Sequence, residues 1–462
     1  MDAPECPGCR ERDARYADLQ RRVAELEARL GVNASNSSLP PSANPLGAPK
    51  PVKKKKSKRK RGGQPGHPPH LRQLLPVEQV DDFVLHVPHH CECCQLPLPF
   101  KAGPDDPLPV RFQTIELPPI LAEVVEHQAH TRVCTGCGTV NQATIPADVR
   151  AHVFGPRFTA TVAQLSGAHG ITKRAAEEIV EGIFGVPIAL GTICNLQREV
   201  SEAIAPAHVE AIEAIQQAEV KFADETGWKR KGKPCWLWTA ATLRVVAFSV
   251  HAKRSARALA DFLGETITGI LHSDRWGVYG QVPAERRQLC WAHLKRDFQK
   301  LIDRGGAGEA TGRAGRRIIK KVFAAWHEFR EGKITRQQLQ ARMEPIERHF
   351  NKVLVEGAMG SDARVQRFCE NLLKVEPGLW TFVSHENVEP TNNFMERLLR
   401  RAVLWRKRSF GCDSVSGCRF VERILTVVQT TRLQGRSSLE YLQSAVAARR
   451  AGQPCPALLS GA

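Results

Sequence analysis

Three acidic side chains stand where they could hold divalent metal. Asp224 lies in the string ADET and Asp274 in HSDRW, each at the end of an apolar, strand-forming run. Glu396 comes much later, in PTNNFMERLLRR, on a segment predicted to be helical. Two carboxylates at strand ends and a third on a late helix are typical of phosphoryl-transfer sites, because Mg²⁺ prefers hard carboxylate oxygens.

The transfer of a DNA phosphodiester needs an activated oxygen nucleophile, charge relief on the phosphate and a stabilised leaving oxygen. Two Mg²⁺ or Mn²⁺ ions about 3.5–4 Å apart provide all three. We expect Asp224 to bridge both ions, while Asp274 and Glu396 each hold one. Taken singly, each acid is better explained as a turn, cap or surface residue, but the order of strands around them favours the metal site.

The elements that would position these acids follow a definite order. Three β-prone runs in close succession predict an antiparallel meander, at 220–228, 234–243 and 245–252. A helix follows at 255–265, and then a buried strand within 266–276 that ends at Asp274. A short strand and a second helix come next, both within 286–302. This is the order of a ribonuclease-H-like α/β core, whose first and fourth strands end side by side. Asp224 and Asp274 are therefore expected to face one cleft.

Three helix-like stretches between about 305 and 380 are predicted to interrupt this core as a helical insertion. The first has Ile319, Phe323 and Trp326 on one stripe, which indicates core packing rather than a ligand site. Thr335 followed by Gln338 predicts a capping box at the start of the second.

The helix of Glu396 has polar and basic neighbours. Asn392, Glu396 and Arg400 recur at helical spacing and are expected to share a face. Basic residues cluster around the acids, which favours phosphate contacts, although a solvated basic face would have the same pattern. They are Arg286, Arg287, Lys295, Arg296, Arg397, Arg400, Arg401, Arg406, Lys407 and Arg408. Active-site support is expected from His293, Asn392 and Asn393, and a buried structural role would explain His293 equally well.

The net charge of +18 and the pI of about 9.5 make a polyanion the natural partner. Residues 32–75 are rich in Pro, Gly and basic groups and are predicted to be a flexible linker. Within them, 50–61 holds nine basic groups and no acid. We expect this run to bind DNA phosphates, a solvated tail being the alternative. The residues assigned to DNA are Lys53, Lys54, Lys55, Lys56, Lys58, Arg59, Lys60 and Arg61.

Residues 1–31 contain a predicted helix with apolar side chains spaced alternately by three and four positions. A short coiled coil and a helix docked on its own chain fit this pattern equally. Cys6 and Cys9 before it form a single CxxC, whose role the sequence leaves open. Neither a secretory signal nor a membrane-spanning run is visible, so a cytoplasmic, nucleoid-associated bacterial protein is predicted.

Residues 76–150 are predicted to be a small β-rich module with two CxxC pairs. Such paired knuckles bring four thiolates to one ion, so we expect a structural Zn²⁺, with a disulfide or an unmetallated core as the alternative. The predicted ligands are Cys91, Cys94, Cys134 and Cys137. The first knuckle reads CECC, and substitutes for its ligands would be Cys93, His89 and His90.

Residues 151–217 are predicted to be helical. The strings RAAEEIVEGIFG and VPIALGTICNLQREVSEAI have the pattern of two helices joined by a turn that contains glycine. A DNA-binding helix-turn-helix and two packed helices without DNA contact both fit. The catalytic domain is expected to span 218–411, with a helical C-terminal element at 412–462.

Taken together, these strings make the chain similar to the large transposases of the insertion sequence 66 type. The resemblance runs nearly end to end, through NSSLPPSANP, RGGQPGH, the two CxxC knuckles, ADET, SDRWGVY, CWAHLKR, EPTNNFMERLLRRAV and RKRSFG. It implies a DDE-type polynucleotidyl transferase with a zinc-binding domain, acting on inverted repeats at the ends of its element. The acids carried over are Asp224, Asp274 and Glu396. The chain departs from the family at CECC and at Phe394–Met395, where small residues are usual.

The leading hypothesis is a DNA transposase that binds the ends of an insertion sequence and catalyses metal-dependent cleavage and strand transfer. It is expected to act as a homo-oligomer on DNA, with small companion proteins of the same element as further partners. A catalytically inactive DNA-binding regulator derived from such an enzyme is the alternative, and a nuclease of the same fold is a third reading. The presence of all three acids argues against a relic.

Overall fold

The computed structural model describes Arg15, Asp18, Leu19, Arg22 and residues 72–459. The chain divides into two compact units, Pro49–Ile120 and the remainder, Met1–Ala48 with Leu121–Ala462. The predicted basic arm, Cys6 and Cys9, and most of the predicted N-terminal helix lie outside the described residues. Within the described part, no helix is long and apolar enough to cross a membrane.

The region predicted to be a β-rich module contains much less regular structure than expected. Between 72 and 146 the structure has only a short 3-10 helix, η2 (Val77–Gln79), and an antiparallel pair of strands, β1 (Thr131–Val133) and β2 (Val140–Gln142). β-prone residues form a strand only where a partner strand can pair with them and bury one face. Val110 and Phe112 remain exposed, which shows that no such partner covers them.

After the short helix α2 (Ala147–Ala151), the chain forms four longer helices: α3 (Pro156–Gly167), α4 (Lys173–Phe184), α5 (Leu190–Ala203) and α6 (Ala205–Gln217). The two helices predicted from sequence are α4 and α5. Gly185 ends α4 with φ 65°, a left-handed conformation that favours glycine. Val180 of α4 and Ile193 of α5 belong to one buried apolar cluster. The helix pair is thus confirmed.

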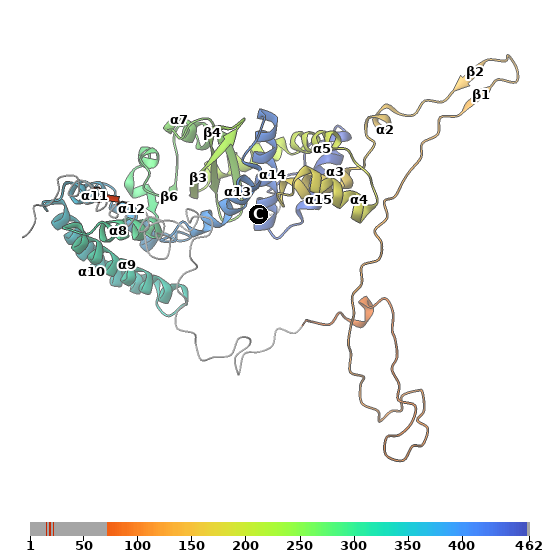
Figure 1. Cartoon of the computed structure of the whole chain (residues 1–462), viewed down its shortest axis with the longest axis horizontal. Helices are drawn as coiled ribbons and strands as arrows, with labels where there is room; N and C mark the ends of the chain where they lie inside the picture. The colour runs from red at the N-terminus through yellow and green to blue at the C-terminus, as the bar shows by residue number, and fades with distance from the viewer. Residues whose placement is uncertain (1–14, 16–17, 20–21, 23–71, 460–462) are drawn as a thin grey trace, which may run out of the picture. The chain divides into compact units, whose positions relative to one another are not determined.

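The centre of the larger unit is a five-stranded sheet in the order β5-β4-β3-β6-β7 (Figure 1). The strands are β3 (Val220–Arg230), β4 (Lys233–Ala241), β5 (Val246–His251), β6 (Ile270–Ser273) and β7 (Arg287–Leu289). β3, β4 and β5 form the predicted antiparallel meander. β6 runs parallel to β3, and β7 parallel to β6. Between β5 and β7 lie α7 (Ala256–Leu263), η3 (Gly277–Gln281) and η4 (Ala284–Arg286).

The outer edge of the sheet is closed by side chains of α14 (Val415–Leu433), which the sequence did not indicate. Alternate N–H groups of the edge strand β5 point away from β4 and need acceptors. Val246 N donates to Thr430 Oγ1 and Phe248 N to Thr426 Oγ1, both at 3.1 Å. Val250 N donates to Glu422 Oε1 at 2.6 Å. The helical spacing of four residues therefore matches alternate residues of the strand. α15 (Ser438–Arg450) completes this end.

The predicted helical insertion consists of α9 (Gly308–Arg330), α10 (Arg336–Ala358) and α11 (Ala363–Leu373), after α8 (Trp291–Arg304). Ile319 and Trp326 are buried in its core, as their stripe predicts. The capping box of Thr335 and Gln338 is also confirmed. α12 (Pro377–Ser384) returns the chain to the sheet, where Phe382 N donates to Gln288 Oε1 of β7 at 2.7 Å.

Two buried histidines predict acid sensitivity. Burial lowers the pKa of His208 and of His272 to about 4. Because the unfolded histidines titrate near pH 6.5, they take up protons before the folded ones, and stability falls as the pH drops from about 6.5 towards 4. Each histidine is expected to lower the free energy of unfolding by about 2 kcal/mol at pH 5, relative to neutral pH.

His208→Gln keeps a donor for the carbonyl oxygen of Phe248, which lies 2.8 Å from His208 Nε2. The variant should lose less stability than the parent between pH 7 and pH 5 in urea unfolding followed by tryptophan fluorescence. Exposed His349→Gln is the control. Equal losses in all three proteins would rule out His208 as a source of the pH dependence.

Candidate active site

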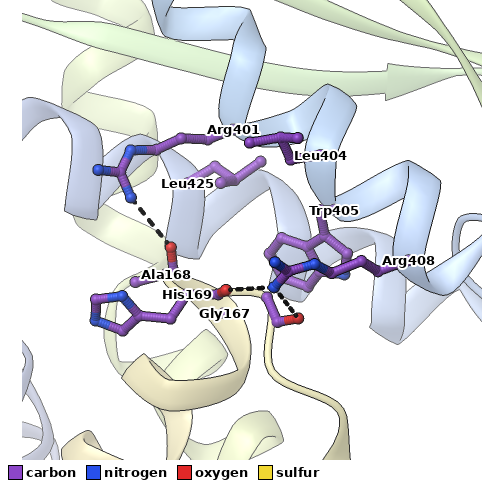
Figure 2. A pocket seen from close by; sticks show the side chains of 9 residues that line it. Gly167, Ala168, His169, Arg401, Leu404, Trp405, Arg408 and Leu425 are labelled. Atoms are coloured by element: carbon purple, nitrogen blue, oxygen red, sulfur yellow. Dashed lines mark hydrogen bonds between the residues drawn. The ribbon is translucent and has the colours of Figure 1, made fainter. Parts of the chain in front are cut away.

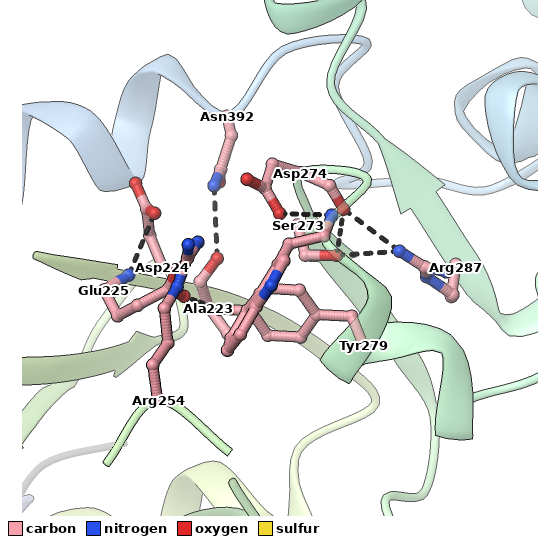
Figure 3. A network of polar contacts seen from close by, with 10 residues as sticks. Ala223, Asp224, Glu225, Arg254, Ser273, Asp274, Tyr279, Arg287 and Asn392 are labelled. Atoms are coloured by element: carbon pink, nitrogen blue, oxygen red, sulfur yellow. Dashed lines mark hydrogen bonds and ion pairs between the residues drawn. The ribbon is translucent and has the colours of Figure 1, made fainter. Parts of the chain in front are cut away.

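The three predicted acids come from three elements of one unit. Asp224 lies in β3, Asp274 directly follows β6, and Glu396 is in the first turn of α13 (Asn393–Ser409). The register of the two parallel strands pairs Phe222 with His272. Asp224 and Asp274 each come two residues further along, so both acids lie at the carboxyl end of β6 (Figure 3). Asp224 does not end its strand, contrary to the prediction, because β3 continues to Arg230 in its pairing with β4.

Asp224 is buried next to other acidic side chains. Withdrawal of its carboxyl group from bulk water, followed by the charges of Glu225 and Asp274, raises the pKa of Asp224 well above its ordinary value. Glu396 adds a smaller effect in the same direction. The fold thus keeps several acidic side chains close together around Asp224.

Hydrogen bonds to both its carboxylate and its backbone carbonyl fix the position of Asp274. Its carboxylate oxygen Oδ1 accepts from Trp276 N at 2.8 Å, and its carbonyl oxygen accepts from Arg287 Nη2 at 3.0 Å. Arg287 is buried, and desolvation lowers the pKa of its guanidinium to about 10. The expectation that Arg287 contacts phosphate was therefore wrong, because the side chain supports the acid from within.

Glu396 is exposed and faces the start of α8. Its Oε1 lies 3.8 Å from Arg296 Nη2. Burial and then Arg296 lower the pKa of His293, while Asp274 and Glu396 oppose this effect. His293 Nδ1 is buried and has no hydrogen-bond partner among the described residues. His293 therefore stands close to two of the acids with one ring nitrogen unused.

Asn392 links the surroundings of all three acids. Its side-chain nitrogen donates to the carbonyl of Ala223, next to Asp224, at 3.2 Å. Its side-chain oxygen lies 3.1 Å from Nδ1 of His272, two residues before Asp274. Its carbonyl accepts from Glu396 N at 3.1 Å. Asn392 is fully buried, as these contacts require.

Asn392 does not share a helix face with Glu396 and Arg400, contrary to the prediction. It is the N-cap of α13, with φ −88° and ψ 24°, so it lies outside the regular helical turn. Its side chain points inward while Glu396 and Arg400 are exposed. Spacing alone could not reveal this, because helical periodicity holds only within the helix. Asn393, the first residue of α13, is exposed.

A second network beside Asp224 was missed from sequence. Buried Glu225 accepts from Arg254 Nε at 2.7 Å and from the hydroxyl of Tyr279. The Arg254 guanidinium stacks 3.7 Å from the ring centre of Trp276. ADET and SDRWGVY contain most of these residues, but nothing near Arg254 in the chain distinguishes it from other basic residues. Only folding brings it to Glu225.

The predicted DNA-contacting residues differ in accessibility. Arg397, Arg400 and Arg401 are exposed, whereas Arg296 is partly buried beside Glu396. Arg406 donates to Thr226 Oγ1 at 2.9 Å and thereby ties α13 to β3. Accessible guanidiniums therefore lie along the helix that carries Glu396.

The donors fit a divalent cation in chemistry. In the described part of the chain, no group of three or more His, Cys, Asp or Glu side chains is arranged to hold a metal ion. Asp224, Asp274 and Glu396 nevertheless supply hard oxygen donors. Burial and then the neighbouring acids raise the pKa of Asp224, and a bound cation would favour its charged form.

The two CxxC pairs form similar turns. Gln95 N donates to the carbonyl of Cys91 at 3.0 Å, and Gly138 N to that of Cys134 at 2.9 Å. All described cysteines are free thiols. One pair belongs to each of the two units, which are described separately, so the shared zinc ion stays a prediction.

A family model described as "Transposase IS66 family" matches residues 151–419. This match covers more than half of the chain and includes all three acids. The chain belongs to the IS66 transposase family. A second model, for a family of unknown function (DUF6444), matches residues 11–73.

Two curated relatives come from Sinorhizobium fredii (strain NBRC 101917 / NGR234), and both are described as uncharacterized proteins. Protein y4qI is 25% identical over 277 residues, which cover 53% of this chain and 50% of the relative. Protein y4hP is 24% identical over 409 residues, which cover 80% of this chain and 72% of the relative. The chain thus spans half the length of the first relative.

The buried, acidic surroundings of Asp224 predict that a neutral residue at this position stabilises the folded protein. Asp224→Asn removes a charge that burial and its acidic neighbours disfavour. The melting temperature in EDTA at pH 8 should rise by roughly 2–4 °C for each kcal/mol gained. Added Mg²⁺ should raise the melting temperature of the parent but not that of the variant, as scanning fluorimetry would show. An equal response to Mg²⁺ in both proteins would contradict a role for Asp224 as ligand.

Proposed function

We propose that this protein is a DNA transposase that binds the ends of an insertion sequence and catalyses metal-dependent cleavage and strand transfer. The observation that carries the proposal is the placement of three acids from three elements: Asp224 on β3, Asp274 directly after the parallel strand β6, and Glu396 on α13. Asn392 is hydrogen-bonded to Ala223, His272 and Glu396 beside them. Membership of a transposase family supports the reaction class, and the exposed arginines of α13 support DNA as substrate.

The carboxylates of Asp224, Asp274 and Glu396 would hold Mg²⁺ or Mn²⁺. Such ions supply an activated oxygen nucleophile and charge relief at the phosphate. Asp224 has to be deprotonated to act as a ligand, and a cation favours this form. Arg287 and Asn392 orient the acids from the protein side. Arg296, beside Glu396, stands where it could neutralise a phosphate.

The catalytic domain is proposed to be ribonuclease-H-like. Three antiparallel strands followed by two parallel ones, in the order β5-β4-β3-β6-β7, support this assignment. The remaining parts of the proposal rest on sequence: a structural Zn²⁺ on the two CxxC pairs, a basic arm on DNA, a DNA-binding role for α4 and α5, and a homo-oligomer with companion proteins.

The test uses DNA that carries the ends of the element, incubated with the full chain and Mg²⁺. The expected result is new 3′-OH ends followed by joining to target DNA, both lost in EDTA. Cleavage without joining would favour a nuclease. Binding without cleavage, also after addition of companion proteins of the element, would favour an inactive DNA-binding regulator and contradict the proposal.

A further inference from the structure

A pocket of about 130 Å³ lies beside α13 (Figure 2). It is lined by the turn that follows α3, by α13 and by α14. Leu404, Trp405 and Leu425 provide apolar walls, while Arg401 and Arg408 bring guanidinium groups to it. A pocket of this size accommodates a small group rather than a whole nucleotide, and its cations select an anion.

Arg401 and Arg408 both donate hydrogen bonds to the turn after α3. Arg401 Nη1 donates to the carbonyl oxygen of Ala168 at 3.3 Å, and Arg408 Nη1 donates to those of His169 and Gly170, both at 3.4 Å. These bonds hold each guanidinium by one terminal nitrogen. Because a guanidinium has five N–H donors, each can bind an oxyanion with the others.

A third arginine, Arg432 of α14, adds positive charge close to Arg401 and His169, although it does not line the pocket. Arg432 Nη1 is buried and has no hydrogen-bond partner in the described structure. Burial, then Arg432 and Arg401, lower the pKa of His169, and burial and Arg401 lower the pKa of Arg432. Arg401, Arg408 and His169 bring basic groups to the pocket, and no acidic side chain is among the described residues that line it. Such crowding is unfavourable until an anion binds.

We propose that Arg401, Arg408 and His169 line a binding pocket for a single phosphate of the DNA backbone. The identity of the ligand as DNA rests on the proposed function. The pocket itself rests on the basic side chains that line it. It differs from a general basic surface because it is hollowed between the turn after α3, α13 and α14.

The location of the pocket gives it a role in DNA register. Arg401 and Arg408 follow Glu396 by 5 and 12 residues on α13. At 1.5 Å per residue, they lie roughly 7.5 and 18 Å along the helix from that acid. A DNA strand advances about 3.4 Å per nucleotide, so the bound phosphate lies roughly two to five nucleotides from the reacting one. The pocket would set which phosphodiester reaches the acids.

The test compares DNA affinity at several salt concentrations in EDTA, where no reaction occurs. One lost phosphate contact should reduce the slope of log affinity against log salt by about 0.9, which is roughly fivefold in affinity near 0.15 M salt. We expect this loss for Arg408→Gln, and no further loss for Arg401→Gln combined with it, because both bind one phosphate. Arg348→Gln, at an exposed position of α10, is the control, and Arg408→Lys should retain most of the slope.

An unchanged slope in Arg408→Gln would overturn the proposal. So would a double variant that loses about twice the slope, because the arginines would then contact separate phosphates. Circular dichroism and melting temperature identify a variant that fails to fold. In that case the salt dependence of Arg408→Lys and a titration with inorganic phosphate test whether the pocket binds phosphate.

A titration with inorganic phosphate tests the pocket without DNA. The ring resonances of His169, assigned by comparison with His169→Gln, should shift saturably in the parent and much less in Arg401→Gln. Absence of a saturable shift in the parent would refute the pocket. A shift together with DNA binding but no cleavage would leave the pocket standing while the proposed reaction fails, so the two failures are distinguishable.

Discussion

Asp274→Asn is expected to abolish Mg²⁺-dependent cleavage and joining while leaving DNA binding in EDTA intact. The amide preserves the shape of the side chain and its hydrogen bond from Trp276 N but removes the negative charge that a metal ion needs. The loss should exceed the roughly 10–100-fold that changes behind a metal ligand cause, because a direct ligand is altered. Gel analysis of end-labelled element DNA measures both steps.

The matched control for this substitution is Asp148→Asn. Asp148 is an exposed acid in α2, and the same chemical change there should leave the rate within about twofold of the parent, since surface substitutions away from a site have small effects. If Asp274→Asn cleaves DNA at the parent rate, the acids are not the catalytic centre. The family relationship would then reflect ancestry without this activity.

Asn392→Ala should have the second largest effect, although the residue is not expected to touch a metal ion or DNA. Its side chain joins Ala223 to His272, and both of these neighbour an acid. Truncation removes the bonds that fix β3 and β6 relative to α13. We expect the rate to fall by about 10–100-fold, the range found when partners behind metal ligands are removed.

A general loss of stability must be separated from this positioning effect. The discriminating measurement is the Mg²⁺ concentration at half-maximal rate, which should rise in Asn392→Ala because misplaced carboxylates bind the ion less tightly. Asn351→Ala, which removes another side-chain hydrogen bond on α10, is the control. A lower melting temperature with unchanged rate and unchanged Mg²⁺ dependence would show that Asn392 serves only the fold.

The edge of the sheet explains why the C-terminal region is integral to the core. Thr426 and Thr430 of α14 satisfy the N–H groups of β5 that no strand pairs with. His208 meets the carbonyl oxygen of Phe248 on the same strand. The sheet therefore ends against polar side chains of two helices instead of an open edge that could pair with another chain.

Local pattern was sufficient for many elements of this chain. The meander of β3 to β5 follows from β-prone runs separated by turn residues, and the capping box at Thr335 from two residues three positions apart. Ile319 and Trp326 were assigned to the core by helical spacing alone. These predictions depend on residues close together in the chain, so their physical cause is contained in the sequence itself.

The same logic failed where a distant partner was required. Val110 and Phe112 have β-prone character, but no strand covers them. Arg287 has the charge expected of a phosphate ligand, yet the fold buries it behind Asp274. Asn392 has helical spacing to Glu396, yet its place at the N-cap turns it inward.

By itself, the sequence determined the types of residue available for chemistry and the order of the elements that carry them. The acids Asp224, Asp274 and Glu396, and the resemblance to a transposase family, were readable without coordinates, and the catalytic roles of the acids stay predictions. Only the tertiary structure decided which side chains meet, as in Glu225 with Arg254 or Asn392 with His272. The physical reason is that burial and long-range contacts set the charge environment of a group, and residues far apart in the chain create both.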